Sequence, residues 1–327
     1  MLNYVFKRVI TMMMTLVVIS MLVFIIIKLP PGDYLSTYIE ELKAQGESVD
    51  QSRIEFLRKR YGLDQPGYVQ YFNWATGLLR GDLGWSFEYD QPVSQVVGET
   101  LMMTIILKLA TVIFIYAMAF PIGVYSATHQ YSWSDHTLTF LGFFGIAVPN
   151  FLLALAVLYA ANVWFGTSIG GLMDAVYIDK PWSWGKFVSV MEHLWAPVFV
   201  IGITGTAGMI RRLRANLLDE LQKQYVTTAR AKGLTERRLL LRYPMRMALN
   251  PFIADVGSLL PQLVSGAVIV SVVMSLPTSG PMLLSALQSQ DMYLAGSFLM
   301  FLATLTVVGM FISDLLLAVL DPRIRLE

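Results

Sequence analysis

Long runs of apolar residues alternate with polar segments along this 327-residue chain. A transmembrane α-helix needs about 20 mostly apolar residues to cross a hydrocarbon core about 30 Å thick. Six runs reach or approach that length, so the pattern predicts six transmembrane helices. Their expected ranges are 9–29, 101–125, 137–163, 194–210, 252–273 and 295–320.

The composition agrees with a helical membrane protein. Hydrophobic residues make up 55% of the chain and charged residues only 14%, and the mean hydropathy is +0.57. Cysteine is absent, which excludes a disulfide framework and any thiolate or cysteine-based metal site. The expected fold class is an all-α polytopic membrane protein.

The distribution of charge predicts the orientation of the helices. Segment 211–251 holds ten Lys and Arg against three Asp and Glu, a net charge of +7, whereas the whole chain carries +1. Lys and Arg concentrate in the cytoplasmic loops of membrane proteins, so we expect this segment in the cytoplasm. Six spans then place both termini on the same side, in agreement with Arg323 and Arg325.

The same pattern divides the chain into three parts. Residues 1–29 form a cytoplasmic start and the first span, which is too long for the core of a cleavable signal peptide. Residues 30–98 form an extracytoplasmic helical subdomain, in which acidic residues outnumber basic ones. Residues 99–327 form the remaining spans. Within the subdomain, Ser52 and Gly62 are expected at the start and just beyond the end of a short helix.

Motifs for catalysis are missing from the sequence. No G-x-x-x-x-G-K-[ST] occurs, and the pair Gly185-Lys186 is followed by Phe187. The chain therefore lacks the loop that cradles ATP phosphates in P-loop proteins. The three histidines show no metal-ligand spacing. We expect neither a catalytic site nor a bound cofactor or metal in this chain.

Polar residues recur along one face of the expected fifth span. Asp255, Ser258, Gln262 and Ser265 follow one another at helical spacing. Polar groups that face hydrocarbon are costly, so this face is expected to contact protein or water. Two interpretations remain open. Ser258, Gln262 and Ser265 line a solute pathway, or the polar side chains bond neighbouring helices together.

The basic segment contains a predicted helix–turn–helix. Residues 219–232 include good helix formers, and Gly233 can adopt the left-handed conformation that ends a helix. Thr235 then offers an N-cap, with Glu236 in the first turn of a second helix. Anionic lipid headgroups would attract such a segment. The small residues around the turn instead suit insertion into a groove of another protein.

Residues 225–238, YVTTARAKGLTERR, strongly resemble integral membrane permeases of ATP-binding cassette importers, in the dipeptide/oligopeptide/nickel branch. The general permease signature E-A-A-x-x-x-G corresponds here to residues 227–233, with Thr227 in place of the leading Glu. Tyr243, Met245 and Arg246 replace the distal I-x-L-P motif. Further blocks resemble the first of two permeases across nearly the whole chain: LPPGD, GLDQPG, GDLGWSF and LDPRIR.

This resemblance implies a non-catalytic transport subunit that forms half of a solute pathway in a bacterial or archaeal cytoplasmic membrane. It implies a second homologous permease, two ATP-binding cassette ATPases that bind ATP and Mg, and an extracytoplasmic solute-binding protein. No nucleic acid is implied. The residues implied to dock the ATPase are Tyr225, Thr228, Ala229, Arg230, Ala231, Lys232, Gly233 and Leu234.

The substrate stays open between oligopeptides, oligosaccharides and metal complexes. Many peptide permeases have E-x-x-F-x-x-P-G-x-G after the fifth span, where this chain has SVVMSLPTSG. Some oligosaccharide importers belong to the same branch. A stand-alone secondary transporter or channel is the alternative class. Such a protein would be expected to show buried ion-coupling carboxylates or broken-helix repeats, and neither pattern is evident.

Overall fold

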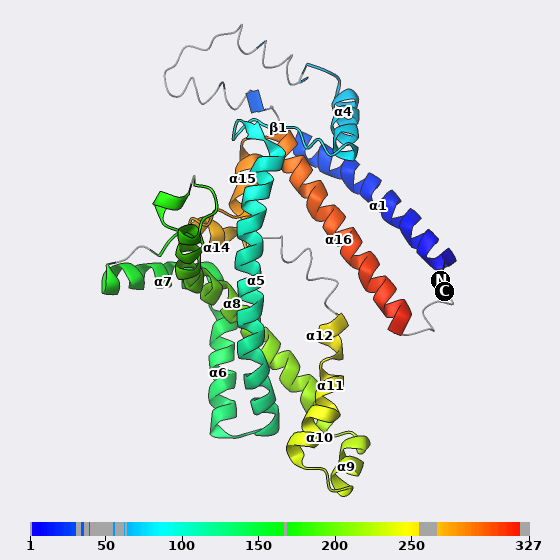
Figure 1. Ribbon diagram of the computed structural model, residues 1–327, viewed down its shortest axis with the longest axis vertical. Helices are drawn as coiled ribbons and strands as arrows, with labels where there is room; N and C mark the ends of the chain where they lie inside the picture. The colour runs from blue at the N-terminus through cyan, green and yellow to red at the C-terminus, as the bar shows by residue number, and fades with distance from the viewer. Residues whose placement is uncertain are drawn as a thin grey trace. The chain divides into compact units, whose positions relative to one another are not determined.

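The computed structural model describes residues 2–30, 34–35, 39, 55, 62, 64–166, 169–178, 180–254 and 267–320. Most of them lie in helices (Figure 1). Among these described residues, four helices are long and apolar enough to cross a membrane, at the first, second, fourth and sixth predicted spans. They lie in α1 (Leu2–Lys28), α5 (Val93–Thr128), α8 (Trp184–Leu221) and α16 (Met292–Leu320).

The third predicted span, 137–163, is not one continuous helix. α6 (Trp133–Ala147) and α7 (Asn150–Phe165) are separated by a break with a bend of 99°. Pro149 lies at this break and explains it. Proline lacks a backbone N–H and disfavours a helical conformation in the preceding residue. The described part of the chain thus contains four candidate spans, or five if this bent pair counts as one.

The fourth predicted span, 194–210, is part of a much longer helix. α8 begins at Trp184 and continues to Leu221, so the helix extends beyond both predicted ends of this span. Residues 211–221 contain neither Gly nor Pro and include several strong helix formers. The helix therefore extends from the apolar region into the basic segment.

Two other predictions fall largely outside the described residues. Of the fifth predicted span, 252–273, the structure describes only its ends, in α12 (Asn250–Ala254) and α14 (Val268–Val273). The predicted helix beginning at Ser52 lies outside the described residues, although Gly62 has the expected positive φ of 63°. The total of six spans and the cytoplasmic position of both termini stay predictions.

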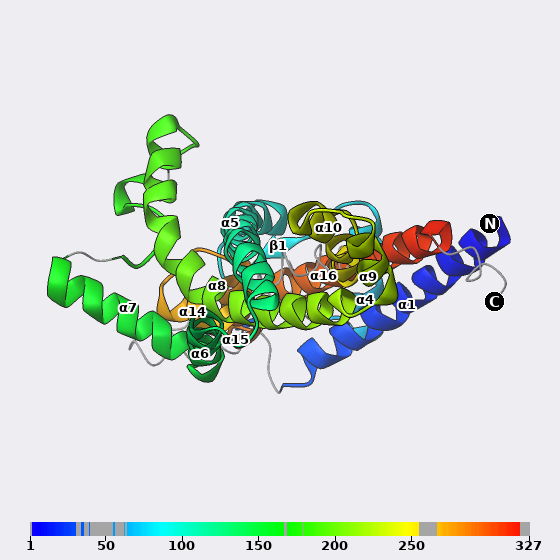
Figure 2. The same ribbon diagram turned by 90° about the horizontal axis from the view of Figure 1, so that it is seen from below.

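The chain divides into two compact units, and the first consists of Met1–Thr104, Gly257–Val268 and Thr278–Glu327. In this unit α1 and α16 lie side by side and run antiparallel (Figures 1 and 2). Phe24, Trp74 and Phe298 belong to one buried core. The unit also contains α4 (Gly67–Leu79), α15 (Ser279–Gln288) and the short antiparallel strands β1 (Trp85–Ser86) and β2 (Gln91–Pro92).

A buried carboxylate fixes the loop between α4 and α5 to the start of α16. Asp291 is fully buried and accepts hydrogen bonds from the hydroxyl of Ser86 (2.7 Å) and from the backbone N–H groups of Phe87 (2.7 Å), Glu88 (3.1 Å) and Leu294 (3.1 Å). A buried donor left without its acceptor costs about 1–3 kcal/mol. Asp291 therefore holds this loop in one conformation.

The second unit consists of Ile105–Val256 and Ile269–Pro277. It contains most of α5, together with α6, α7, α8 and the short 3-10 helix Ala175–Tyr177. Its basic segment holds α9 (Gln224–Ala231), α10 (Glu236–Arg242), α11 (Pro244–Ala248) and α12. In Figure 1, α9 and α10 lie beyond the C-terminal end of α8.

Small residues on α8 allow α5 to pack closely against it. A Cβ atom at Gly202 would lie 2.6 Å from Cδ1 of Phe114, and one at Gly205 would lie 2.6 Å from Cδ1 of Ile115. Both distances are too short for a real side chain. Close approach through small residues is typical of helix packing within membranes.

Candidate functional site

The helix–turn–helix predicted in the basic segment is present as α9, a turn and α10, residues 224–242, here called the docking unit. Gly233 has a φ of 80°, and its N–H donates to the carbonyl of Arg230 at 3.0 Å. The prediction of a left-handed residue at this turn is confirmed. A Cβ at Gly233 would meet no atom of the described chain within 4 Å. Backbone conformation alone therefore favours glycine here.

The boundaries of the two helices refine the prediction. The helix expected over 219–232 is divided, since α8 ends at Leu221 and α9 begins at Gln224. Thr235 occupies the N-cap position of α10 as predicted, but its side chain makes no capping hydrogen bond in the described chain. Glu236 lies in the first turn of α10, where a negative charge interacts favourably with the helix dipole.

A small apolar core holds α9 against α10. Val226, Ala229 and Leu239 are buried with 0%, 7% and 0% exposure, and Leu234 packs against them. The sequence predicts Ala229 on the small-residue surface, whereas the structure places it beneath that surface. Its small side chain lets the two helices approach each other.

An ion pair closes the turn on its outer side. Nε of Arg230 lies 2.6 Å from Oε1 of Glu236, and Nη2 lies 3.0 Å from Oε2. The hydrogen bonds between the two side chains lower the pKa of Glu236 and raise the pKa of Arg230. Exposed pairs contribute little to stability. The bidentate geometry therefore matters mainly for the orientation of α9 and α10.

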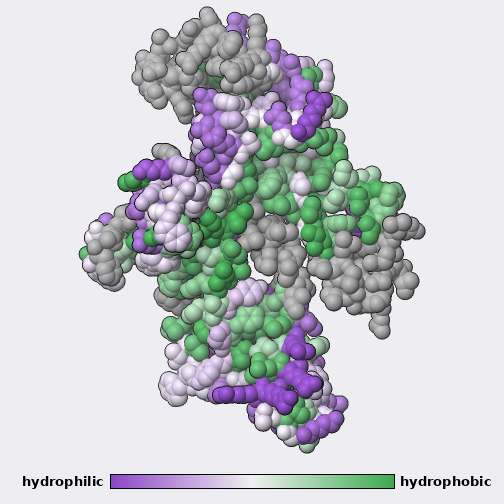
Figure 3. All heavy atoms as spheres, viewed as in Figure 1, coloured by the Kyte–Doolittle hydropathy of each residue, from purple (hydrophilic) through white to green (hydrophobic). Residues whose placement is uncertain are grey.

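The remaining predicted docking residues lie on the outside of the docking unit. Thr228, Ala231, Lys232 and Gly233 are exposed, and Tyr225 is 37% exposed. Hydrophilic residues gather at this end of the second unit, next to the apolar surface of its longer helices (Figure 3). The docking unit thus presents a small, basic surface around Ala231 and Gly233 that is available to a partner.

Tyr225 connects the docking unit to the end of α8. Its hydroxyl donates to Oε2 of Glu220 at 2.5 Å. Burial and this bond to Glu220 raise the pKa of Tyr225 to about 12, so the phenol stays protonated and can donate throughout the physiological pH range. Glu220 belongs to the last turn of α8, and the bond therefore spans the break between α8 and α9.

A second apolar core attaches the segment after the docking unit to α5 and α8. Ala127 from α5, Leu217 from α8 and Ala248 from α11 are buried together. Nearby, the guanidinium of Arg212 lies 4.4 Å from the ring centroid of Phe252, a cation–π contact. These contacts, together with the packing of Leu240 from α10 against the same core, join the docking unit to two of the long helices of the second unit.

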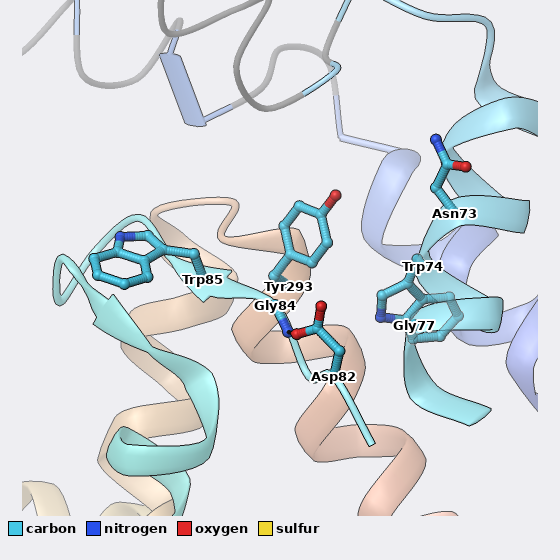
Figure 4. A pocket seen from close by; sticks show the side chains of 7 residues that line it. All are labelled: Asn73, Trp74, Gly77, Asp82, Gly84, Trp85 and Tyr293. Carbon is cyan, nitrogen blue, oxygen red and sulfur yellow. Dashed lines mark hydrogen bonds between the residues drawn. The ribbon is translucent and has the colours of Figure 1, made fainter. Parts of the chain in front are cut away.

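The first unit holds a different kind of site, a pocket of about 310 Å³. Figure 4 shows the ring of Tyr293 between those of Trp85 and Trp74, with the Asp82 carboxylate nearby. Gly84 has a φ of 83°, and a Cβ there would lie 2.4 Å from Cδ1 of Tyr293. Aromatic faces beside a carboxylate suit a cationic group. The sequence motifs gave no indication of this pocket.

The predicted pathway residues Ser258, Gln262 and Ser265 lie outside the described residues, as does Asp255. Their role stays a prediction. Among the residues that the structure describes, no group of three or more His, Asp or Glu side chains is arranged to hold a metal ion.

Comparisons with known proteins cover nearly the whole chain. A family model described as "Binding-protein-dependent transport system inner membrane component" matches residues 119–326. A model for the N-terminal part of the membrane component of such systems matches residues 1–110. The docking unit lies within the first of these matches.

Individual relatives are similar over nearly their full length. The oligopeptide transport system permease protein AppB of Bacillus subtilis is 33% identical, over 98% of this chain and 99% of its own. A putative peptide permease protein of Brucella ovis is 31% identical over 99% of both chains. The dipeptide transport system permease protein DppB of Escherichia coli K12 is 29% identical, also over 99% of both chains.

The conformation of Gly233 gives a direct structural prediction. Replacement of Gly233 by Ala is expected to strain the turn by about 1–2 kcal/mol, because a Cβ disfavours the left-handed conformation. Amide exchange at Leu239, whose N–H donates to the carbonyl of Thr235, should then accelerate about fivefold or more. Gly233→Asn is the matched control, since Asn tolerates this conformation better. Equal exchange rates in wild type and Gly233→Ala would contradict the prediction.

Proposed function

Because the chain belongs to the inner membrane components of binding-protein-dependent transport systems, in their dipeptide and oligopeptide branch, we propose that it is the permease subunit of an ATP-driven importer. It forms half of a transmembrane pathway, and its docking unit receives the motion of an ATPase. The observation that carries this proposal is the exposed turn at Gly233, connected through Tyr225 and a buried core to the end of α8.

The assembly proposed around this chain has four kinds of subunit. A second homologous permease completes the pathway, two cytoplasmic ATPases bind ATP and Mg, and an extracytoplasmic solute-binding protein delivers the substrate. The lack of a P-loop motif in this sequence supports separate ATPase subunits. The site of action is the cytoplasmic membrane of a bacterium or archaeon. Apolar side chains such as Met14, Ile113 and Met310 are 60–67% exposed, which suits contact with lipid and with a partner permease.

The docking unit is proposed to move as a rigid body with the end of α8. An ATPase groove holds the exposed surface around Ala231 and Gly233. A displacement of α9 reaches α8 through the bond from Tyr225 to Glu220 and through the core at Leu217. Packed cores shift between discrete arrangements instead of deforming continuously. The motion therefore changes the tilt of α8, which opens the pathway to one side of the membrane or the other.

Oligopeptides are the proposed substrates. The relatives AppB and DppB are named for oligopeptide and dipeptide transport, which supports peptides over the oligosaccharides that the sequence leaves open. The delivering protein determines much of the selectivity in this scheme. An uptake assay should therefore include an oligosaccharide as a comparison substrate.

The coupling role of the docking unit is testable at Ala231. This residue is exposed on α9, so Ala231→Trp adds volume to the docking surface without disturbing a buried core. In proteoliposomes that contain the full assembly, we expect ATP-dependent peptide uptake to fall at least about tenfold, since each 1.4 kcal/mol of lost binding is a factor of ten.

Leu241→Trp is the matched control for Ala231→Trp. Leu241 is 64% exposed on α10 and lies outside the predicted docking residues, so uptake should stay near the wild-type rate. Wild-type uptake by the Ala231→Trp assembly would refute the docking role. Uptake by this chain alone, without ATPases, would favour the alternative of a secondary transporter or channel.

The proposed pathway residues can be tested because the chain has no native cysteine. Single cysteines at Ser258, Gln262 and Ser265 are expected to react with a membrane-impermeant thiol reagent in at least one nucleotide state, because a pathway contains water. Cysteines at exposed apolar positions of α1, such as Met14, serve as lipid-facing controls. If all three pathway positions resist the reagent in every nucleotide state, the polar face packs against protein instead.

A further inference from the structure

A groove of about 270 Å³ lies between α6 and α8 in the second unit. Its α6 wall contains Leu138, Gly142 and Ile146, which lie on one face of that helix at spacings of four residues. Its α8 wall contains Ala207 and Ile210. Thr139 also lines the α6 wall, and the other residues along this length are apolar. The groove therefore suits a hydrocarbon chain.

Two connections on either side of the groove hold the helices in place. At one end, Arg214 donates to Asp135 through Nε (3.1 Å) and Nη2 (2.8 Å). At the other end, the hydroxyl of Thr204 lies 2.9 Å from the carbonyl oxygen of Gly145 and 2.6 Å from Oδ1 of Asn150. Along the two antiparallel helices, these two connections are separated by about ten residues, or about 15 Å. The groove is a built feature of the fold.

Positive charge lies at only one end of the groove. Arg211 and Arg214 line that end, and Arg211 is exposed. The charge of Arg214 is balanced by Asp135, which is 2% exposed and also accepts hydrogen bonds from the hydroxyl of Ser126 and the backbone N–H of Tyr131. Within the described part of the chain, Arg211 has no such partner, so this end of the groove keeps one unbalanced positive charge.

The position of Arg211 along α8 indicates the source of a matching ligand. Arg211 directly follows the apolar part of α8 and opens the basic segment 211–251, which the distribution of Lys and Arg places on the cytoplasmic side. This is the depth of the inner-leaflet headgroups, and that leaflet is rich in anionic lipid. Basic pockets between transmembrane helices on the cytoplasmic side suit such headgroups.

We propose that the groove between α6 and α8 binds one anionic phospholipid of the inner leaflet, with its phosphate at Arg211 and an acyl chain along Leu138, Gly142 and Ile146. The lipid then contacts the same end of α8 that carries the docking unit. This proposal does not depend on the substrate or on the ATPase partners.

Native mass spectrometry of the full-length chain, purified in mild detergent, tests the charged end of the groove. The wild-type chain should retain phosphatidylglycerol about fivefold better than phosphatidylcholine, the effect of one basic residue near an anionic surface. Arg211→Gln should lose this preference. Arg238→Gln removes an exposed charge from α10 of the same basic segment and should keep it. An unchanged preference in Arg211→Gln, or an equal loss in both variants, overturns the proposal.

A second pair of variants tests whether a lipid occupies the groove itself, by adding volume at the end where Arg211 and Arg214 lie. Ala215 is exposed and lines the groove, so Ala215→Trp should reduce retention of both lipids at least fivefold, whereas Leu241→Trp should not. Full lipid retention in Ala215→Trp would show that only a surface charge is involved and would overturn the proposal. Loss of the retained lipid on addition of the partner permease would also overturn it, since a protein helix would then occupy the groove.

Discussion

The proposed transmission of motion through the second unit depends on the attachment of the docking unit to the C-terminal end of α8. A helix transmits an axial or lateral push along its length because its backbone hydrogen bonds are internal, and α8 continues without interruption for 38 residues. The apolar core around Leu217, Ala127 and Ala248 and the bond from Tyr225 to Glu220 join the docking unit to that helix. In the proposed mechanism, these contacts carry a displacement of the docking unit to α8.

The basic residues of segment 211–251 have several different partners. Arg212 lies over the ring of Phe252, Arg214 pairs with buried Asp135, and Arg230 pairs with Glu236 across the turn. Removal of one partner from a buried ion pair destabilises the folded protein by several kcal/mol. Net charge alone therefore describes this segment poorly. Some of its arginines position helices, and Arg211 and Lys232 extend the positive surface.

Local patterns in the sequence were sufficient for several features. Hydropathy indicated the helices of the first, second, fourth and sixth spans, and the Gly233–Thr235 pattern indicated the turn between α9 and α10. The extension of α8 past Ile210 was missed because the predicted span ended at the first charged residues. Several of these residues are strong helix formers, and the helix continues through them. The bonds from residues 86–88 to Asp291 and the pair Asp135–Arg214 join residues 79 to 205 positions apart. A periodic pattern contains no information about such pairings.

We propose that the docking unit and the end of α8 move together as one body. Spin labels at cysteines introduced at Leu241 and Asp219, both exposed, would report the distance between the docking unit and α8 by pulsed electron paramagnetic resonance. If the two move together, the distance distribution should be narrow and the same in the nucleotide-free and ATP-bound assemblies. A shift or a second population on ATP binding would show that the docking unit pivots on α8, and would contradict a rigid connection between them.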